Sequence, residues 1–121
     1  ALEAVKNSYN SYTMDMLTLD AATASVKDDA YFREICARVI QTRERSAQTF
    51  CEMGFTVLPS QTNFLLVTHP EKSAKELFEK LRAQKIFVRY FNQPRVDNHL
   101  RVTIGTDDEM DKLFEALQAI M

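Results

Sequence analysis

The sequence VRYFNQPRVDNHLRVTIGT, residues 88–106, contains two strand-like runs joined by a polar loop with a proline. Side chains alternate between the two faces of a strand, so Arg89 points away from its apolar neighbours, as does Arg101 in the second run. If the apolar sets face the helices of the protein, both guanidinium groups emerge on the opposite face of the sheet. The stretch therefore predicts a sheet with an apolar side and a side that carries two cations.

Two more strands precede this stretch. Short runs rich in β-branched and aromatic residues occupy Phe55–Leu58 and Asn63–Thr68, separated by a turn-forming segment that contains a proline. The strands within and beside the quoted stretch cover residues 86–90 and 100–104.

Two helices are predicted before the first strand. Apolar residues at helical spacing place the first at Thr13–Ser25, with Thr13 or Ser11 as its N-cap. The second begins at the Asp28-Asp29 pair and ends at Gly54.

The long second helix has an apolar side and a charged side. Its apolar stripe, expected to face the core, consists of Phe32, Ile35, Val39, Ala47, Phe50 and Cys51. Its other side is expected to be a solvated face with ion pairs and consists of Arg33, Glu34, Arg38, Arg43, Glu44 and Arg45. Cys36 and Cys51 fit small buried thiols within a helix better than a disulfide framework.

Capping boxes at residues 73–76 and 106–109 open two further helices. The resulting order, α-α-β-β-α-β-β-α, predicts an α+β fold. Its sheet is small and mainly antiparallel, with helices on one face.

The composition is that of a single globular domain. The chain has 121 residues, of which 45% are hydrophobic and 26% charged, and its formal net charge is −2. No basic cluster indicates nucleic-acid binding, no segment is long enough to cross a bilayer, and no signal-peptide pattern begins the chain. His69 and His99 lack further ligands at metal spacing, so we expect both on the surface or in loops and no metal site. The sequence thus predicts a cytoplasmic protein in which residues 1–121 form one domain.

The face of the two arginines has two interpretations. It is either the solvated side of an open antiparallel sheet, or an anion clamp, because planar guanidinium groups bind phosphate and carboxylate in a bidentate manner. Phe87 and Phe91 are expected on the same side as Arg89, and aromatic residues there indicate that another domain or subunit covers the face. The face is then half of a cleft, which includes Thr103 and, on one interpretation, Asn63.

Four motifs resemble the C-terminal small domain of the histidinol-phosphate aminotransferases, pyridoxal-phosphate enzymes of the aspartate aminotransferase fold. They are YNSYT at 9–13, SQTNFLLV at 60–67, IFVRYFNQP at 86–94 and LRVTIGTDDEM at 100–110. The likeness covers nearly the whole chain in the family's order, and the last two motifs together are the most specific. Ser8 departs from the pattern, because the family usually has proline there.

The resemblance implies substrate-binding residues. Arg89 resembles the family's arginine that holds the substrate phosphate, and Arg101 resembles the arginine that binds this phosphate and also the carboxylate of glutamate. Asn63 belongs to an Asn-Phe pair that many aminotransferases of this fold share. Tyr9 and Asn10 match a segment beside the active site, although Asn10 fits a turn or a helix cap equally well.

The resemblance also implies that the catalytic and cofactor-binding residues lie outside this chain. Pyridoxal-phosphate chemistry needs a Schiff-base lysine, a phosphate cradle and an acidic partner for the pyridinium nitrogen, which the family places in its large domain. We therefore expect a catalytically silent small domain, with residues 1–12 leading in from a missing large domain. The implied parent is a homodimer that passes an amino group between glutamate (or 2-oxoglutarate) and imidazole acetol phosphate, in histidine biosynthesis.

Two alternatives stay open at this point. A related pyridoxal-phosphate enzyme for another phosphorylated amino compound, such as threonine-phosphate decarboxylase, could use a similar arginine pair. The chain could also be an autonomous α+β module that binds a small anion.

Overall fold

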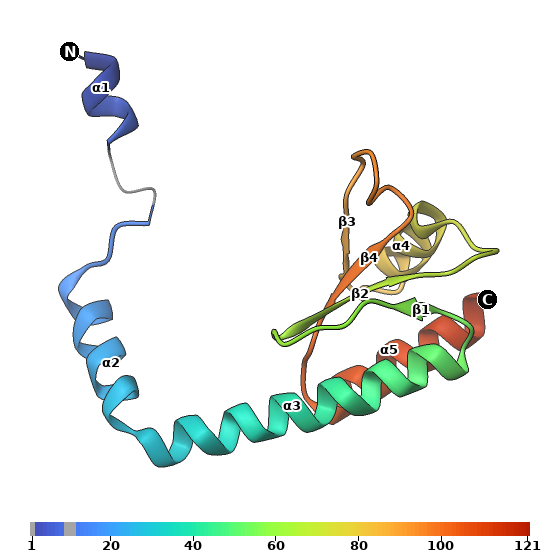
Figure 1. Ribbon diagram of the computed structural model, residues 1–121, viewed down its shortest axis with the longest axis horizontal. Helices are drawn as coiled ribbons and strands as arrows, with labels where there is room; N and C mark the ends of the chain where they lie inside the picture. Colours follow the sequence, from blue (N-terminus) through green and yellow to red (C-terminus); the bar gives the residue numbers. More distant parts are fainter. Residues whose placement is uncertain (1, 9–11) are drawn as a thin grey trace. The chain divides into compact units, whose positions relative to one another are not determined.

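The computed structural model describes residues 2–8 and 12–121 and divides the chain into two units, residues 1–35 and 36–121. The expectation of one domain over residues 1–121 stays a prediction. The first unit contains α1 (Leu2–Asn7), α2 (Met16–Lys27) and the beginning of α3 (Asp29–Glu52) (Figure 1). The predicted order lacked α1, and the N-cap predicted for the next helix is wrong. Asp15 caps α2, because its carboxylate accepts a hydrogen bond from the Thr18 N–H at 2.9 Å.

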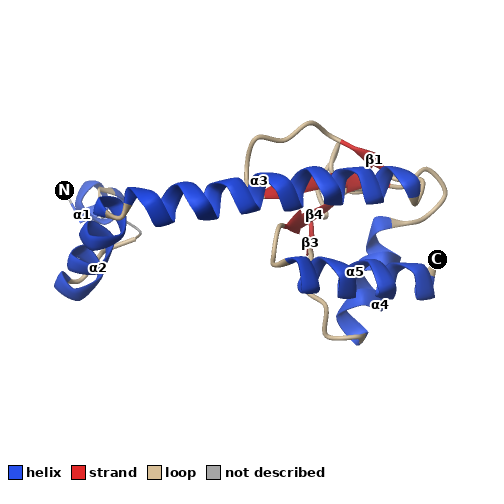
Figure 2. Ribbon diagram, turned by 90° about the horizontal axis from the view of Figure 1, so that it is seen from below, coloured by secondary structure: helices blue, strands red, loops and turns tan. Residues whose placement is uncertain are grey.

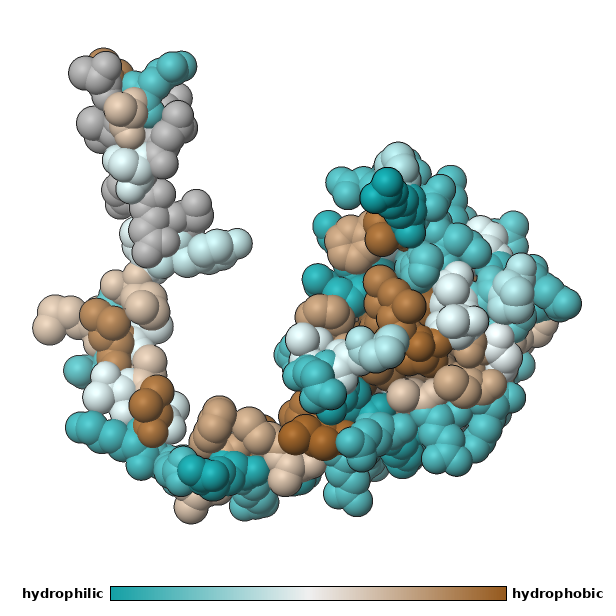
Figure 3. All heavy atoms as spheres, in the orientation of Figure 1, coloured by the Kyte–Doolittle hydropathy of each residue, from teal (hydrophilic) through white to brown (hydrophobic). Residues whose placement is uncertain are grey.

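Helix α2 buries none of its residues. Figure 3 shows hydrophobic side chains at the surface of this part of the chain, and Met16, Leu17 and Val26 are among the most exposed. None of the helices in the described ranges is both long enough and apolar enough to cross a membrane.

The second unit holds a four-stranded antiparallel sheet of β1 (Thr56–Val57), β2 (Phe64–Thr68), β3 (Arg89–Tyr90) and β4 (Leu100–Thr103). Its strand order is β1-β2-β4-β3, so β4 lies between β2 and the edge strand β3. From α2 onward the predicted α+β fold and its order of elements are confirmed. The strands are shorter than predicted.

The helices α3, α4 (Ala74–Ala83) and α5 (Asp107–Ile120) pack on one face of this sheet. Figure 2 shows α4 and α5 side by side, in agreement with the contacts between them. One hydrophobic cluster joins the helices to the strands. It includes Phe50, Leu65, Val67, Leu77, Leu81, Leu100, Val102, Leu113, Phe114 and Leu117.

The predicted helix ends of this unit are largely confirmed. Ser73 caps α4 by accepting from the Glu76 N–H, and Thr106 and Glu109 form a reciprocal capping box at α5. The backbone N–H of Thr106 donates to the Glu109 carboxylate and lowers the pKa of that carboxyl group. Gly54 follows α3 with a φ of 86°, in the left-handed region that glycine adopts without strain.

Two expectations about single residues are wrong, and His69 lies in a loop as expected but is buried there. Arg43 is buried rather than solvated, because α3 turns this side chain toward the loop before β2. Cys51 is exposed, while Cys36 is half-buried, and both are free thiols. His69 is 8% exposed and packs edge-on against Phe55, with ring centroids 5.0 Å apart.

Other charged residues of α3 form the expected ion pairs. Arg33 pairs with Asp29 at 2.6 Å, within one turn of the helix. Arg45 pairs with Asp107 at 3.1 Å and Asp111 at 2.5 Å, both on α5. All these side chains are partly exposed, so the pairs stabilise the fold little, and the two pairs of Arg45 connect α3 to α5.

The conformation of Gly54 yields a test of the packing. We expect Gly54→Ala to lower the free energy of unfolding by about 1–2 kcal/mol, because a left-handed residue with a Cβ is strained. The added Cβ would also lie 3.1 Å from Nε2 of His69. Urea unfolding measures the loss.

Ser46→Ala is the matched control, since it places the same side chain at a buried position. The Ser46 hydroxyl has no hydrogen-bond partner, so its removal should leave stability unchanged or raise it. Equal losses in both variants would contradict the role of the Gly54 backbone.

Candidate functional site

The two arginines are cross-strand neighbours. Arg89 on β3 is the register partner of Arg101 on β4, and the next pair is Tyr90 with Leu100. Directly opposed residues of an antiparallel pair have side chains on the same face. Since Leu100 is buried in the core, both guanidinium groups lie on the face of the sheet opposite the helices.

Aromatic rings hold the two guanidinium groups close together. The Cζ of Arg89 lies 5.3 Å from the ring centroid of Phe91, and the Cζ of Arg101 lies 5.6 Å from the same ring. Arg101 also lies 5.3 Å from the ring of Phe64 on β2. Each such contact contributes about 0.5–1 kcal/mol at an exposed site, so the rings restrain both cations without neutralising either charge.

Neither arginine has an acidic partner in the part of the chain that the structure describes. The ion pairs within 4.0 Å there use Arg33 and Arg45, and no described side chain or carbonyl accepts a hydrogen bond from Arg89 or Arg101. Two like charges opposite each other repel, and an anion between them would remove that repulsion.

The rest of this face carries both apolar side chains and threonines. Leu66 is the register partner of Arg101, and Phe64 is the partner of Thr103, which is exposed. Figure 3 shows hydrophobic surface over the strands of this unit. The sequence placed Arg101 and Thr103 here correctly but missed Phe64 and Leu66, because the β2 and β4 register cannot be read from the sequence.

Asn63, the remaining predicted site residue that the structure describes, does not lie on the face of the two arginines. Asn63 is exposed just before β2, its carbonyl accepts from the Ile104 N–H at 2.8 Å, and it alternates with Phe64 rather than sharing its face. Tyr9 and Asn10 lie outside the described residues. Substrate binding by these three residues stays a prediction.

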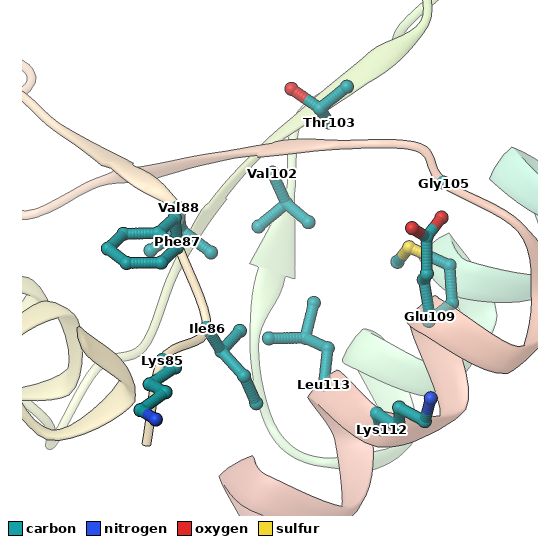
Figure 4. A pocket seen from close by; sticks show the side chains of 11 residues that line it. Lys85, Ile86, Phe87, Val88, Val102, Thr103, Gly105, Glu109, Lys112 and Leu113 are labelled. Atoms are coloured by element: carbon teal, nitrogen blue, oxygen red, sulfur yellow. The ribbon is translucent and has the colours of Figure 1, made fainter. Parts of the chain in front are cut away.

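Phe87 belongs to a different surface from Phe91. Its side chain is 76% exposed and lines a cleft of about 420 Å³ between the segment before β3 and the beginning of α5. Figure 4 shows Ile86 and Leu113 facing each other in this cleft, and it shows Val102 and Thr103 pointing to opposite sides of β4. The expectation that two phenylalanines flank Arg89 is therefore supported by a contact only for Phe91.

Asn98 fixes the loop between β3 and β4. Its side-chain oxygen accepts from the Ala74 N–H at 2.9 Å, and its carbonyl accepts from the Thr68 hydroxyl at 2.5 Å. These bonds connect the loop to α4 and to the end of β2. The loop that begins with Phe91 is thus attached to the core near its other end, at Asn98.

The arrangement can bind a small anion with two or more oxygens. Two guanidinium groups offer paired N–H donors in a fixed plane, and hydrogen bonds to charged groups contribute roughly 1.5–3 kcal/mol each. Among the described residues, no cluster of three or more histidine, cysteine or carboxylate side chains is arranged to hold a metal ion.

Known proteins share both the sequence and the fold. The family model described as "Aminotransferase class I and II" matches residues 1–117. Histidinol-phosphate aminotransferases of Acinetobacter baumannii (strain SDF) and Marinomonas sp. (strain MWYL1) are 50% and 49% identical over 98% of this chain. The chain spans about a third of their length, 33% and 34%.

A solved structure shows the same fold. The histidinol-phosphate aminotransferase from Sinorhizobium meliloti in complex with pyridoxal-5'-phosphate matches 98% of this chain with a TM-score of 0.81 and 25% identity. The match covers 34% of that protein.

The opposed charges predict an unusual salt dependence. At low ionic strength Arg89→Gln should gain up to about 1 kcal/mol of unfolding free energy from losing the repulsion of Arg101. The loss of the contact between Arg89 and the Phe91 ring, about 0.5–1 kcal/mol, offsets that gain. Added sodium chloride should reduce this gain, since the Debye length shortens from about 30 Å at 0.01 M to about 10 Å at 0.1 M. Urea unfolding at both salt concentrations measures it.

Arg82→Gln serves as the control, because it removes one exposed arginine from the last turn of α4. It should not reproduce the gain. If the stability of Arg89→Gln relative to the unmodified chain does not fall as salt is added, the two arginines do not repel each other, and the unneutralised pair is contradicted.

Proposed function

Because the chain belongs to the class I and II aminotransferase family, we propose that it is the C-terminal small domain of a histidinol-phosphate aminotransferase. The full-length parent passes an amino group between glutamate and imidazole acetol phosphate, with 2-oxoglutarate as the other product, in histidine biosynthesis. Residues 1–12 lead in from its large domain. The chain itself supplies binding and orientation rather than catalysis.

One observation carries the proposal. Arg89 and Arg101 lie opposite each other on adjacent strands, outside the core and without an acidic partner among the described residues. Two unneutralised guanidinium groups on one face of the sheet suit a ligand with a phosphate group. The identity of about 50% to histidinol-phosphate aminotransferases supports a phosphorylated substrate of that kind.

In this proposal the two arginines bind different groups of the substrates. Arg89, the more exposed on the edge strand β3, binds the phosphate of the phosphorylated substrate. Arg101, held between the rings of Phe64 and Phe91, binds that phosphate and also the carboxylate of glutamate in the other half-reaction. Asn63, Tyr9 and Asn10 complete the substrate-binding set.

The described residues of this chain do not fit pyridoxal phosphate. Both glycines have structural roles, since Gly54 ends α3 and a Cβ on Gly105 would lie 2.5 Å from the Glu109 carboxylate. Lys72 and Lys80 donate to the carbonyl groups of Met121 and Ile120 at the end of the chain. We therefore place the cofactor and its lysine in the large domain and derive no step through it here.

The proposed partners follow from the same assignment. The large domain of the same polypeptide covers the outer face of the sheet, and the full-length enzyme is a cytoplasmic homodimer. Phe64 and Leu66, which lie beside Arg101 on this face, support such a cover, because apolar side chains on an outer face mark interaction sites.

The kinetics of the full-length parent test these separate binding roles of Arg89 and Arg101. Arg89→Ala should reduce kcat/KM for the phosphorylated substrate by about 1.5–3 kcal/mol of transition-state stabilisation, with a smaller loss for glutamate. Arg101→Ala should impair both half-reactions. Each half-reaction is measured separately in single turnovers.

Arg82→Ala is the control, as an exposed arginine on α4 that lies outside the proposed site. Equal losses for both substrates in Arg89→Ala, or an unimpaired glutamate half-reaction in Arg101→Ala, would contradict the assignment. Decarboxylated products from the full-length protein would favour the threonine-phosphate decarboxylase alternative. Micromolar binding of a phosphate ester by this chain alone would favour the autonomous anion-binding module.

A further inference from the structure

Arg43 occupies a position in α3 that suits an apolar residue. Its side chain is 7% exposed, and it lies at helical spacing from the buried Ser46 and Phe50 and the half-buried Ala47. It forms no ion pair with a described carboxylate, although Glu44 lines the same surface cleft. A buried charge without a partner is unfavourable, and an apolar side chain of similar length would be easier to bury. What arginine adds at this position is its hydrogen-bond donors.

The guanidinium group of Arg43 holds the loop before β2. Its Nη1 donates to the carbonyl of Thr62 at 3.0 Å. The Ser60 hydroxyl shapes the same loop, since it accepts from the Thr62 N–H at 3.1 Å and donates to the Phe64 carbonyl at 2.6 Å. Residues 60–64 therefore form a tight hydrogen-bonded unit whose attachment to α3 is Arg43.

This loop ends at the aromatic ring that contacts Arg101. Phe64 begins β2, two residues after Thr62, and its ring centroid lies 5.3 Å from the Cζ of Arg101. The other ring at Arg101 belongs to Phe91, which is attached to a different loop. The loop that Arg43 holds thus leads directly into one of the two rings that contact Arg101.

We infer that Arg43 is a positioning residue for the anion-binding pair. Its buried guanidinium fixes the Thr62 carbonyl, and through it the Phe64 ring, so that Arg101 is held in the orientation that faces an anion together with Arg89. The role in anion binding rests on the proposed function, whereas the connection from Arg43 to Phe64 and Arg101 can be tested without any ligand.

The first measurement needs only the chain itself. We expect Arg43→Met to keep or raise the free energy of unfolding, because methionine is long, apolar and flexible. The side-chain NMR resonances of Arg101 should nevertheless shift, since the ring current of Phe64 acts on them. They should move toward their positions in Phe64→Leu. Arg101 resonances identical to those of the unmodified chain would overturn the inference.

The second measurement is a titration with inorganic phosphate, followed through the Nε–H resonances of Arg89 and Arg101. It extends well above micromolar concentrations, because the chain without the large domain is expected to bind phosphate more weakly than an autonomous anion-binding module would. Arg43→Met should weaken binding by between about 2-fold and 30-fold, the range for residues that act through a contact network. In the Phe64→Leu background the same substitution should have no further effect. Full additivity of the two substitutions would show that Arg43 does not act through Phe64.

Arg45→Met is the matched control. It removes the same charge from the neighbouring position, but its guanidinium group binds Asp107 and Asp111 on α5. It should leave the Arg101 resonances and phosphate binding unchanged. If Arg45→Met changed them as much as Arg43→Met does, the loss of one positive charge would explain both effects, and the positioning role of Arg43 would be refuted. If Arg43→Met gives no cooperative unfolding transition, Arg43→Leu replaces it, because leucine also lacks a hydrogen-bond donor, and it should move the Arg101 resonances in the same direction.

The two hypotheses fail in different ways. If phosphate leaves Arg89 and Arg101 unchanged in the unmodified chain, the anion clamp fails for this chain, and the resonance shift still decides the role of Arg43. If phosphate binds equally well to the unmodified chain and to Arg43→Met, the clamp stands and the inference about Arg43 is wrong.

Discussion

The pairing of β3 with β4 is the constraint on which the candidate site depends. The core requires Leu100 and Val102, so Arg101 between them has to face outward. The antiparallel register then places Arg89 directly opposite Arg101. A shift of this register by one residue would turn Arg89 toward the helices. The hydrophobic core therefore determines where the charges lie, although it contains neither of them.

Three arginines of the second unit take part in interactions that do not favour folding. Two like charges are opposed without an acid among the described residues, and a third arginine, Arg43, is buried with a carbonyl as its recorded partner. Phe64 and Phe91 orient Arg101 but leave its charge free. Side-chain arrangements that are unfavourable for local stability are characteristic of sites that bind a ligand or another part of a protein. The fold tolerates them because the core on the other side of the sheet is continuous.

Strand alternation and helix-end chemistry were sufficient to predict the fold and the shared face of Arg89 and Arg101. They could not predict that Phe64, rather than Asn63, lies beside Arg101, because this depends on the register of two strands 30 or more residues apart in the chain. The burial of Arg43 did have a signal, since residues 43, 46, 47 and 50 follow helical spacing. The charge of arginine predicts a solvated side chain, and this expectation outweighed the position of residue 43 on the apolar side of the helix.

The most direct test of the shared anion is a crystal structure of the full-length polypeptide with a phosphate-ester substrate bound. The account predicts that nitrogen atoms of both Arg89 and Arg101 lie about 3 Å from oxygens of one bound anion. It would be contradicted if the phosphate were held by other residues while these two arginines formed ion pairs with carboxylates of the protein itself.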